Sequence, residues 1–233
     1  CRGAGTGLAG GATCKYGGIM LSVMRMNKIF PVDHKNQTIT AQPGALLIDI
    51  QAAAKEEGLF YPPDPGEKFA TLGGNVSTNA GGMRAVKYGC TRDYVRAMTV
   101  VLPTGEIVKL GATVSKTSTG YSLLNLMIGS EGTLGIITEL TLKVIPAPKS
   151  VISLIIPYEN LEDCIATVPK FFMEHLQPQA IEFMEKEIVL ASERYLGKSV
   201  FPQKLEGVDI GAYLLVTFDG DDMESLEEIT EKA

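Results

Sequence analysis

The chain has 233 residues, of which 45% are apolar, enough for one large domain or two smaller ones with ordinary cores. Acidic residues outnumber basic ones by 27 to 21, and the net charge of −6 argues against a nucleic-acid binder that works through a general basic field. No apolar run approaches the roughly 18 residues of a membrane span, and the four cysteines lack the CxxC spacing of a zinc site.

Short apolar runs alternate with glycine-rich turns through the first part of the chain. The patterns predict a strand over residues 17–26, a short strand closed by a turn over 37–44, and a helix over 45–58. Residues 94–110 predict a β-hairpin whose turn is Pro-Thr-Gly-Glu, and residues 133–148 predict a β-rich segment that ends in prolines.

After about Lys149 the pattern changes to strand, helix, strand, helix. We expect strands at 151–158 and 211–220, and helices at 160–175 and 222–233. This order indicates a second α+β unit, which stops in the middle of its pattern.

The chain begins CRGAGTGLAGGATC, a stretch dense in glycine. Gly5 to Gly10 satisfies G-x-G-x-x-G, but no helical spacing follows and no acidic residue stands about 20 positions on, which excludes a Rossmann dinucleotide motif. Successive amides in a glycine turn can instead form a concavity for an anion, and Arg2 would add charge or brace the loop. A tight turn without a ligand is the alternative for this segment alone.

Two further stretches repeat this pattern beside predicted strands. They are PPDPGEKFATLGGNVSTNAGG at residues 62–82 and GSEGTLGII at residues 129–137. Their glycines expose backbone amides, and their Asn and Thr side chains supply hydrogen-bond donors and acceptors. Three such loops predict convergence on one extended ligand with a phosphate centre.

These stretches resemble the FAD-binding domain of the vanillyl-alcohol oxidase (PCMH-type) flavoprotein family, and most of all its branch of glycolate oxidases, D-lactate dehydrogenases and D-2-hydroxyglutarate dehydrogenases. The resemblance runs through RGAGTGLAGGA, YPPDPGEKFATLGGNVSTNAGGMRAVKYGCTRDYV and KTSTGYSLLNLMIGSEGTLGIITELTLKVIPAP. It implies an α+β fold. A PCMH-type FAD-binding domain over 1–148, without its N-terminal part, would precede the start of a ferredoxin-like cap or substrate domain over 149–233. The chain accordingly resembles an internal fragment.

The resemblance also implies how FAD would lie. The first loop would wrap the pyrophosphate, the second would run along the pyrophosphate and flavin, and the third would lie near the adenosine end. The cofactor-binding residues that it implies are Arg2, Gly3, Ala4, Gly5, Thr6, Gly7 and Leu8; Asp64, Thr71, Gly73, Gly74, Asn75, Thr78, Asn79, Gly81 and Gly82; Tyr88 and Gly89; and Glu131, Gly135, Ile136 and Ile137.

The two histidines bear on how FAD is attached. Family members that tether flavin through histidine often carry it in the first loop, whereas His34 and His175 lie outside every cofactor motif. We therefore expect FAD to be held without a covalent bond, and both histidines to be ordinary surface or core residues.

The branch implies an enzyme that oxidises a D-2-hydroxy acid of the D-lactate or glycolate type to the 2-oxo acid, with hydride transfer to flavin N5. The His/Glu cluster that helps related enzymes bind a divalent metal and the substrate is absent from this sequence. We therefore assign no catalytic and no metal-binding residue, and expect the ligands of any metal in the full-length protein outside this chain.

The resemblance leaves several partners and functions open. The electron acceptor would be an electron-transferring flavoprotein, a quinone or an iron–sulfur partner subunit, and the location cytoplasmic or peripheral to the membrane. One alternative function is an FAD-containing transferase resembling alkyldihydroxyacetone-phosphate synthase. The other is a non-catalytic flavin-binding subunit of a larger redox complex.

Overall fold

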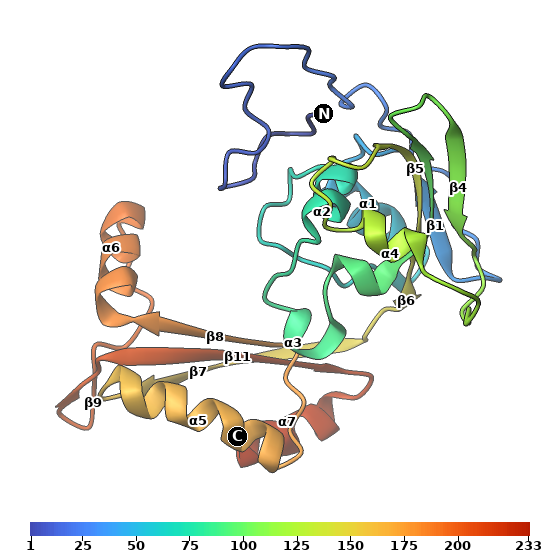
Figure 1. The fold of residues 1–233 in the computed structure, drawn as a ribbon. Helices are drawn as coiled ribbons and strands as arrows, with labels where there is room; N and C mark the ends of the chain where they lie inside the picture. The colour runs from blue at the N-terminus through green and yellow to red at the C-terminus, as the bar shows by residue number, and fades with distance from the viewer. The chain divides into compact units, whose positions relative to one another are not determined.

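The computed structural model describes residues 1–233, which divide into two compact units (Figure 1). The first unit comprises Cys1–Gly82 and Gly89–Ala147, and the second comprises Met83–Tyr88 and Pro148–Ala233. Each unit has its own antiparallel sheet and its own helices, so the predicted α+β fold class is confirmed.

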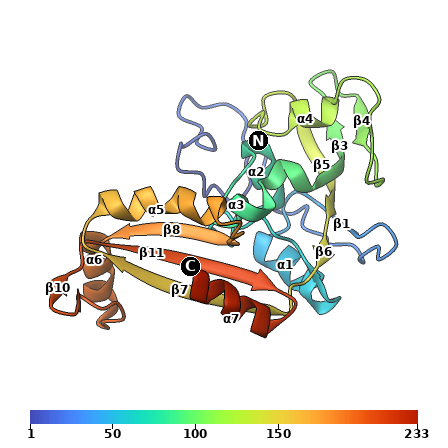
Figure 2. The same ribbon diagram turned by 90° about the horizontal axis from the view of Figure 1, so that it is seen from below.

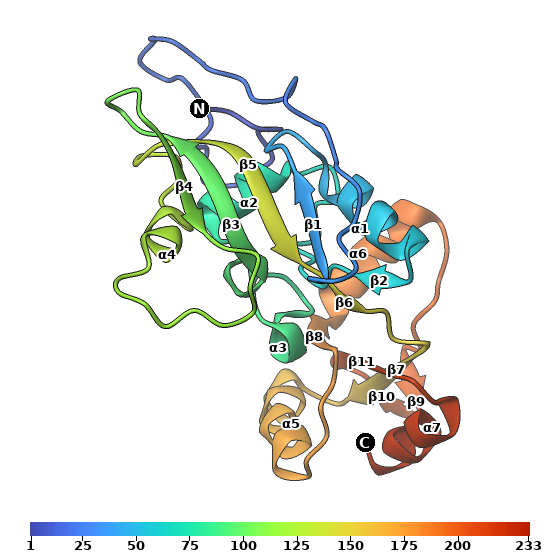
Figure 3. The same cartoon turned by 90° about the vertical axis from the view of Figure 1, so that its right-hand side faces the viewer.

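The first unit is built on a four-stranded antiparallel sheet in the order β1-β5-β3-β4 (Figure 3). Its strands are β1 (Thr38–Ala41), β3 (Val95–Val101), β4 (Ile107–Gly111) and β5 (Ile136–Lys143). β3 and β4 form the predicted hairpin, in which Val101 lies opposite Ile107. Strand β5 pairs with both β1 and β3 and carries the buried residues Leu140 and Leu142 into the core.

Short helices and one small ladder complete the first unit. They are α1 (Leu47–Glu56), α2 (Leu72–Thr78), α4 (Leu123–Met127), the 3-10 helix η1 (Thr91–Tyr94) and the antiparallel pair β2 (Leu59–Phe60) and β6 (Ile145–Pro146). Helix α1 lies where the sequence predicts it and ends just before Gly58, whose φ is +71°. Helix α2 is a correction, because residues 72–78 were expected to be loop. Its N-cap is Thr71, whose hydroxyl accepts a hydrogen bond from the Gly74 amide.

The strand predicted over residues 17–26 is wrong. The segment makes only an isolated bridge, between Ser22 and Arg2, and it starts with Gly17 and Gly18 at φ values of +76° and +111°. Positive φ values at both glycines take the backbone out of the extended conformation that a strand needs. Ile19 is fully exposed, so no sheet buries the apolar run.

The second unit contains a three-stranded antiparallel sheet in the order β7-β11-β8. Its strands are β7 (Ser150–Tyr158), β8 (Ala180–Glu185) and β11 (Ala212–Gly220), and helices α5 (Leu161–Met173) and α7 (Met223–Lys232) lie along the sheet (Figure 2). Leu214, Val216 and Phe218 of β11 pack against Phe171 of α5 and Leu226 of α7. β7, β11 and both helices lie where the sequence predicts them.

Several elements of the second unit have no counterpart in the prediction. They are β8, α3 (Ala85–Tyr88), α6 (Lys186–Leu196), and the pair β9 (Lys204–Leu205) and β10 (Val208–Asp209). Strand β8 has the sequence AIEFME, whose two glutamates conceal the apolar alternation of a strand. No helix in either unit combines the length and the apolar character needed to cross a bilayer.

Candidate functional site

Three segments that are far apart in the sequence line one cavity of about 180 Å³ in the first unit. They lie within residues 1–12, 70–78 and 131–137, and Val23 and Pro43 complete the wall. The three glycine-rich stretches therefore meet at one cavity, as their motifs predict. Pockets for whole small-molecule ligands usually enclose roughly 300–1,000 Å³, so this cavity suits one part of an extended ligand.

The first loop, residues 2–12, presents a run of unpaired hydrogen-bond donors. The backbone N–H groups of residues 3–9 donate no hydrogen bond within the chain. The base of the loop is fixed, because the Arg2 amide donates to the Leu21 carbonyl (2.8 Å) and the Arg2 carbonyl accepts from the Val23 amide (3.0 Å). Consecutive free amides on a fixed base can bind phosphate oxygens without breaking an existing hydrogen bond.

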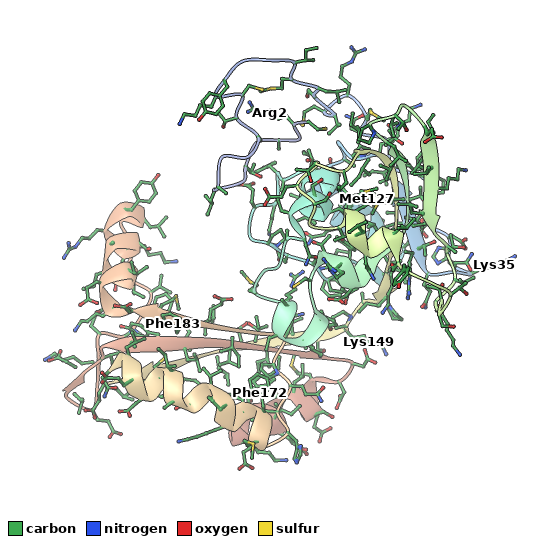
Figure 4. All side chains as sticks on the ribbon, in the orientation of Figure 1. Arg2, Lys35, Met127, Lys149, Phe172 and Phe183 are labelled. Carbon is green, nitrogen blue, oxygen red and sulfur yellow. The ribbon has the colours of Figure 1, made fainter.

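The Arg2 side chain lies beside Gly5 of this loop and does not line the cavity. A Cβ atom built on Gly5 would lie 2.6 Å from Arg2 Nη2, and Arg2 Nη1 lies 4.0 Å from the sulfur of Met20. Figure 4 labels Arg2 in this N-terminal segment. The guanidinium therefore places a positive charge close to Gly5, where it favours an anion bound to the loop.

The second segment enters the cavity as helix α2, whose first amides are already paired. The Leu72 amide donates to the Ala45 carbonyl and the Gly73 amide to the Pro43 carbonyl, both at 2.8 Å. The Gly74 amide donates to Thr71 Oγ1 at 3.4 Å. Helix α2 therefore offers side chains to a ligand instead of backbone donors.

Asn75 is a polar side chain of α2 at the cavity wall. The residue is 5% exposed, and its side-chain amide makes no hydrogen bond within the chain. This amide can therefore donate to or accept from a polar ligand in the cavity.

The first loop and helix α2 meet at a very close contact. A Cβ atom built on Gly3 would lie 2.1 Å from Thr71 Oγ1, so only glycine allows this approach. The Thr71 hydroxyl therefore caps α2 and also defines how closely the first loop packs on it.

The third segment is tied to the carboxyl end of α2 by its own backbone. The Gly129 amide donates to the Val76 carbonyl (3.0 Å), and the Glu131 amide donates to the Ser77 carbonyl (2.8 Å). Glu131 adopts a positive φ of +53° and carries the only charged side chain in the cavity lining. Its carboxylate can accept hydrogen bonds from hydroxyl or amino groups of a ligand.

The structure brings many of the implied cofactor residues together. Those that line the cavity are Gly3, Ala4, Gly5, Thr6, Gly7, Thr71, Gly73, Gly74, Asn75, Thr78, Glu131, Gly135 and Ile137. Those outside the lining are Arg2, Leu8, Asp64, Asn79, Gly81, Gly82, Gly89 and Ile136 in the first unit, and Tyr88 in the second.

Some lining residues were not identified from the sequence. They are Cys1, Ala9, Gly11, Ala12, Val23, Pro43, Ala70, Ser77 and Gly132. Most of them neighbour a glycine motif, which was the available signal. Val23 and Pro43 carry no such signal, because only the fold brings them to the cavity.

Two buried tyrosines lie in the core of the first unit. The rings of Tyr61 and Tyr94 meet edge to face with centroids 5.8 Å apart. Burial raises the pKa of both phenols, that of Tyr94 to about 12. Both therefore stay neutral near pH 7 and pack as aromatic core residues.

The histidines and cysteines lie apart from any cluster. The exposed His34 Nε2 lies 3.0 Å from Glu57 Oε2, and neither His34 nor His175 lines the cavity. All four cysteines, Cys1, Cys14, Cys90 and Cys164, are free thiols. Residues 1–233 contain no group of three or more His, Cys, Asp or Glu side chains that could hold a metal ion.

Comparisons with known proteins agree with this geometry. Residues 1–111 match the family model for the FAD binding domain, and residues 147–233 match the model for the C-terminal domain of FAD linked oxidases. A D-lactate dehydrogenase of Anaerostipes hadrus is 74% identical over 231 residues, which are 99% of this chain and 49% of that protein. The glycolate oxidase subunit GlcD of Bacillus subtilis is 40% identical over 238 residues, 99% of this chain and 49% of that protein.

The chain thus spans about half the length of these curated relatives. Among solved structures, an alkyldihydroxyacetonephosphate synthase is similar with a TM-score of 0.72 at 24% identity, over 91% of this chain and 41% of that one. At this level of identity the similarity concerns the fold.

Proposed function

Because the chain belongs to the family of FAD-linked oxidases, we propose that it is the cofactor-binding part of a flavoprotein that oxidises a D-2-hydroxy acid to the 2-oxo acid. The observation that carries the substrate class is the 74% identity, across 99% of the chain, to a protein named D-lactate dehydrogenase. The similarity to a glycolate oxidase component supports the same class of small 2-hydroxy acids.

The cavity fits FAD through its unpaired donors. On this proposal the pyrophosphate lies against the free amides of residues 3–9, with the Arg2 charge close to Gly5. Helix α2 contributes the side chains of Thr71, Asn75 and Thr78, because its first amides are already paired. Glu131 and the start of β5 lie toward the adenosine end.

When bound, FAD supplies flavin N5 as the acceptor of the hydride from the α-carbon of the hydroxy acid. The part of this chain is to bind and orient the cofactor. The first loop does so with backbone N–H donors, which do not titrate near neutral pH. No histidine lines the cavity, which supports non-covalent attachment. No residue of the chain is assigned as the base that takes the hydroxyl proton.

The same proposal divides the chain by role. Residues 1–148 form the FAD-binding domain, and residues 149–233 begin a substrate domain. The break between the compact units at Ala147 and the start of the second family match at residue 147 support this boundary. On this proposal the electron acceptor would be an electron-transferring flavoprotein, a quinone or an iron–sulfur partner, and the protein would act in the cytoplasm or at the membrane periphery.

The test is the visible spectrum of the native polypeptide that carries this chain, recorded before and after anaerobic addition of D-lactate. L-Lactate is the matched control, and glycolate and D-2-hydroxyglutarate test neighbouring substrates. We expect the flavin bands to bleach with D-lactate and not with L-lactate. Flavin released by denaturation should then be identified as FAD.

Each other outcome removes a part of the proposal. FAD that no hydroxy acid reduces would overturn the oxidation and favour the transferase or the non-catalytic flavin-binding protein. Flavin that stays with the denatured protein would overturn non-covalent attachment. A well-folded native protein without flavin would overturn the assignment of the cavity.

A further inference from the structure

Asp219, near the end of β11, is the centre of a buried polar cluster that the proposed function does not use. Its side chain is fully buried. Oδ1 forms an ion pair with Lys87 Nζ, and Oδ2 accepts hydrogen bonds from Tyr88 Oη and Gln179 Nε2, both at 2.6 Å. The main-chain carbonyl of Asp219 accepts a further hydrogen bond from Lys87 Nζ at 3.2 Å.

Such a cluster is costly to assemble unless every member is paired. A carboxylate taken out of water loses hydration energy, and only close donors and an opposite charge restore it. Here the ammonium of Lys87, the phenol of Tyr88 and the amide of Gln179 all donate to one side chain. Removing Asp219 would leave these donors without the acceptor that holds them.

Two of the three donors come from one short segment, Met83–Tyr88, which we call the strap. The strap packs as part of the second unit, although the residues before and after it in the sequence belong to the first unit. Its sequence position follows directly on Gly81 and Gly82, which the family resemblance places at the end of the second cofactor stretch.

The strap is also fixed where it leaves the first unit. Gly82 has a φ of +141°, and a Cβ atom built on it would lie 1.8 Å from the Asp64 carbonyl oxygen. No other residue fits there. The segment that starts in helix α2 is thus held tightly at Gly82, and the next residues are held by Asp219. Only residues 83–86 separate Gly82 from Lys87, the first residue of the strap that binds Asp219.

We propose that Asp219 is a positioning residue for the cofactor site, which acts through Lys87, Tyr88 and the strap. Docking of the strap on Asp219 holds the end of the second cofactor stretch in its binding conformation. The inference rests on the proposed function, because it takes FAD to be the ligand of the cavity. Tyr88 then serves the cofactor by anchoring the strap, and not by touching the flavin.

Thermodynamic linkage makes this proposal quantitative. If bound FAD increases the equilibrium constant for strap docking by some factor, docking of the strap increases the FAD binding constant by the same factor. A purely structural role for Asp219 would stabilise the second unit without any such reciprocity. The two roles are therefore separated by measuring both equilibria in the same variants.

Docking of the strap can be followed by proteolysis, because trypsin cleaves after Arg84 and Lys87. The experiment uses the native polypeptide and follows cleavage at these two bonds by mass spectrometry, with and without saturating FAD. The variant is Asp219→Asn, which keeps the shape of the side chain and removes its charge. The matched control is Asp209→Asn, an exposed aspartate of the same unit that lies 3.6 Å from Lys204 Nζ.

We expect Asp219→Asn to raise the rate of strap cleavage about tenfold and the Kd for FAD about twofold. The docked fraction would fall to about one half, and the Kd rises in inverse proportion to that fraction. FAD should slow cleavage of the wild type, and Asp209→Asn should match the wild type in both measurements. Tyr88→Phe, which removes one hydrogen bond and keeps the ring, should shift both quantities in the same direction by less. It replaces Asp219→Asn as the deciding variant if the latter does not fold.

Faster cleavage with an unchanged Kd would show that Asp219 only stabilises the second unit, and would overturn the proposal. A raised Kd with unchanged cleavage would overturn it as well, because the strap would not be the link. A wild-type protein that binds no FAD would instead overturn the proposed function, and with it this inference.

Discussion

The first loop and helix α2 line the same cavity and are both rich in glycine, but they differ in whether their backbone amides are hydrogen-bonded within the chain. In the first loop the amides of residues 3–9 have no partner within the chain. In α2 the amides of Leu72, Gly73 and Gly74 are all paired, with the Ala45 carbonyl, the Pro43 carbonyl and the Thr71 hydroxyl. The backbone N–H groups of the first loop can therefore bind a ligand, whereas those at the start of α2 are used in hydrogen bonds that stabilise the helix.

The glycines of the two regions differ in the same way. A Cβ atom on Gly7 of the first loop would meet nothing within 4 Å, whereas one on Gly73 of α2 would lie 2.5 Å from Pro43 Cβ. Gly7 borders open cavity, and Gly73 allows close packing. A glycine-rich motif therefore does not by itself distinguish ligand contact from packing, and substitutions can separate the two roles.

Gly7→Val tests the ligand-facing role and carries the largest expected effect. Gly7 has no positive φ and open space around its α-carbon, so valine should fold without strain and project beside the free amides. We expect FAD affinity to fall about 100-fold, or about 2.7 kcal/mol, while the free energy of unfolding of the apoprotein changes by less than about 0.5 kcal/mol. FAD titration and urea unfolding measure the two quantities. An unchanged Kd would remove the first loop from the FAD site.

Gly73→Ala tests the packing role. The new methyl group would overlap Pro43, and overpacking of this kind costs typically about 1–3 kcal/mol. We expect the urea midpoint of the apoprotein to fall accordingly. Gly74→Ala is the matched control in the same helix, because its Cβ would approach only Thr71 Oγ1, at 3.0 Å. Equal stability of the two variants would show that the contact with Pro43 does not explain the glycine at 73.

Thr71→Val tests the contact where the two regions meet. Valine keeps the shape of threonine but removes the hydroxyl that accepts from the Gly74 amide, and losing an N-cap of this kind costs about 1 kcal/mol. Thr71→Ser restores the hydroxyl and should recover most of the lost stability. If Thr71→Val unfolds at the same urea concentration as the wild type, the cap does not stabilise α2 measurably.

The contrast between these regions also explains what could be predicted from sequence. Helix α1, the β3–β4 hairpin, β7 and β11 were predicted because their signals are local, namely periodic apolar residues and turn residues. Helix α2 was expected to be loop because its glycines were taken to expose backbone amides to a ligand. The amides of Leu72 and Gly73 are instead paired with the carbonyls of Ala45 and Pro43, which are distant in sequence, so this pairing could not be predicted from the local pattern.

The same distinction applies to the cavity. Convergence of three glycine-rich stretches was predictable, because each one carries its own motif. The wall contributed by Val23 and Pro43 was not, because these residues carry no signal of a ligand. Tyr88 lies within a cofactor motif by sequence, but its hydroxyl donates to Asp219 in the second unit. Long-range pairing of this kind depends on the completed fold.

His34→Ala should have the smallest effect on flavin occupancy. It tests whether FAD is held without a covalent bond to this histidine. The His34 and Glu57 side chains are 58% and 52% exposed, and exposed pairs contribute at most about 1 kcal/mol. We expect the variant to retain full flavin occupancy after purification and to release FAD on denaturation as the wild type does. Loss of flavin from this variant alone would mean that attachment involves His34. The comparison between a donor-rich loop and a self-paired helix would then no longer account for cofactor binding.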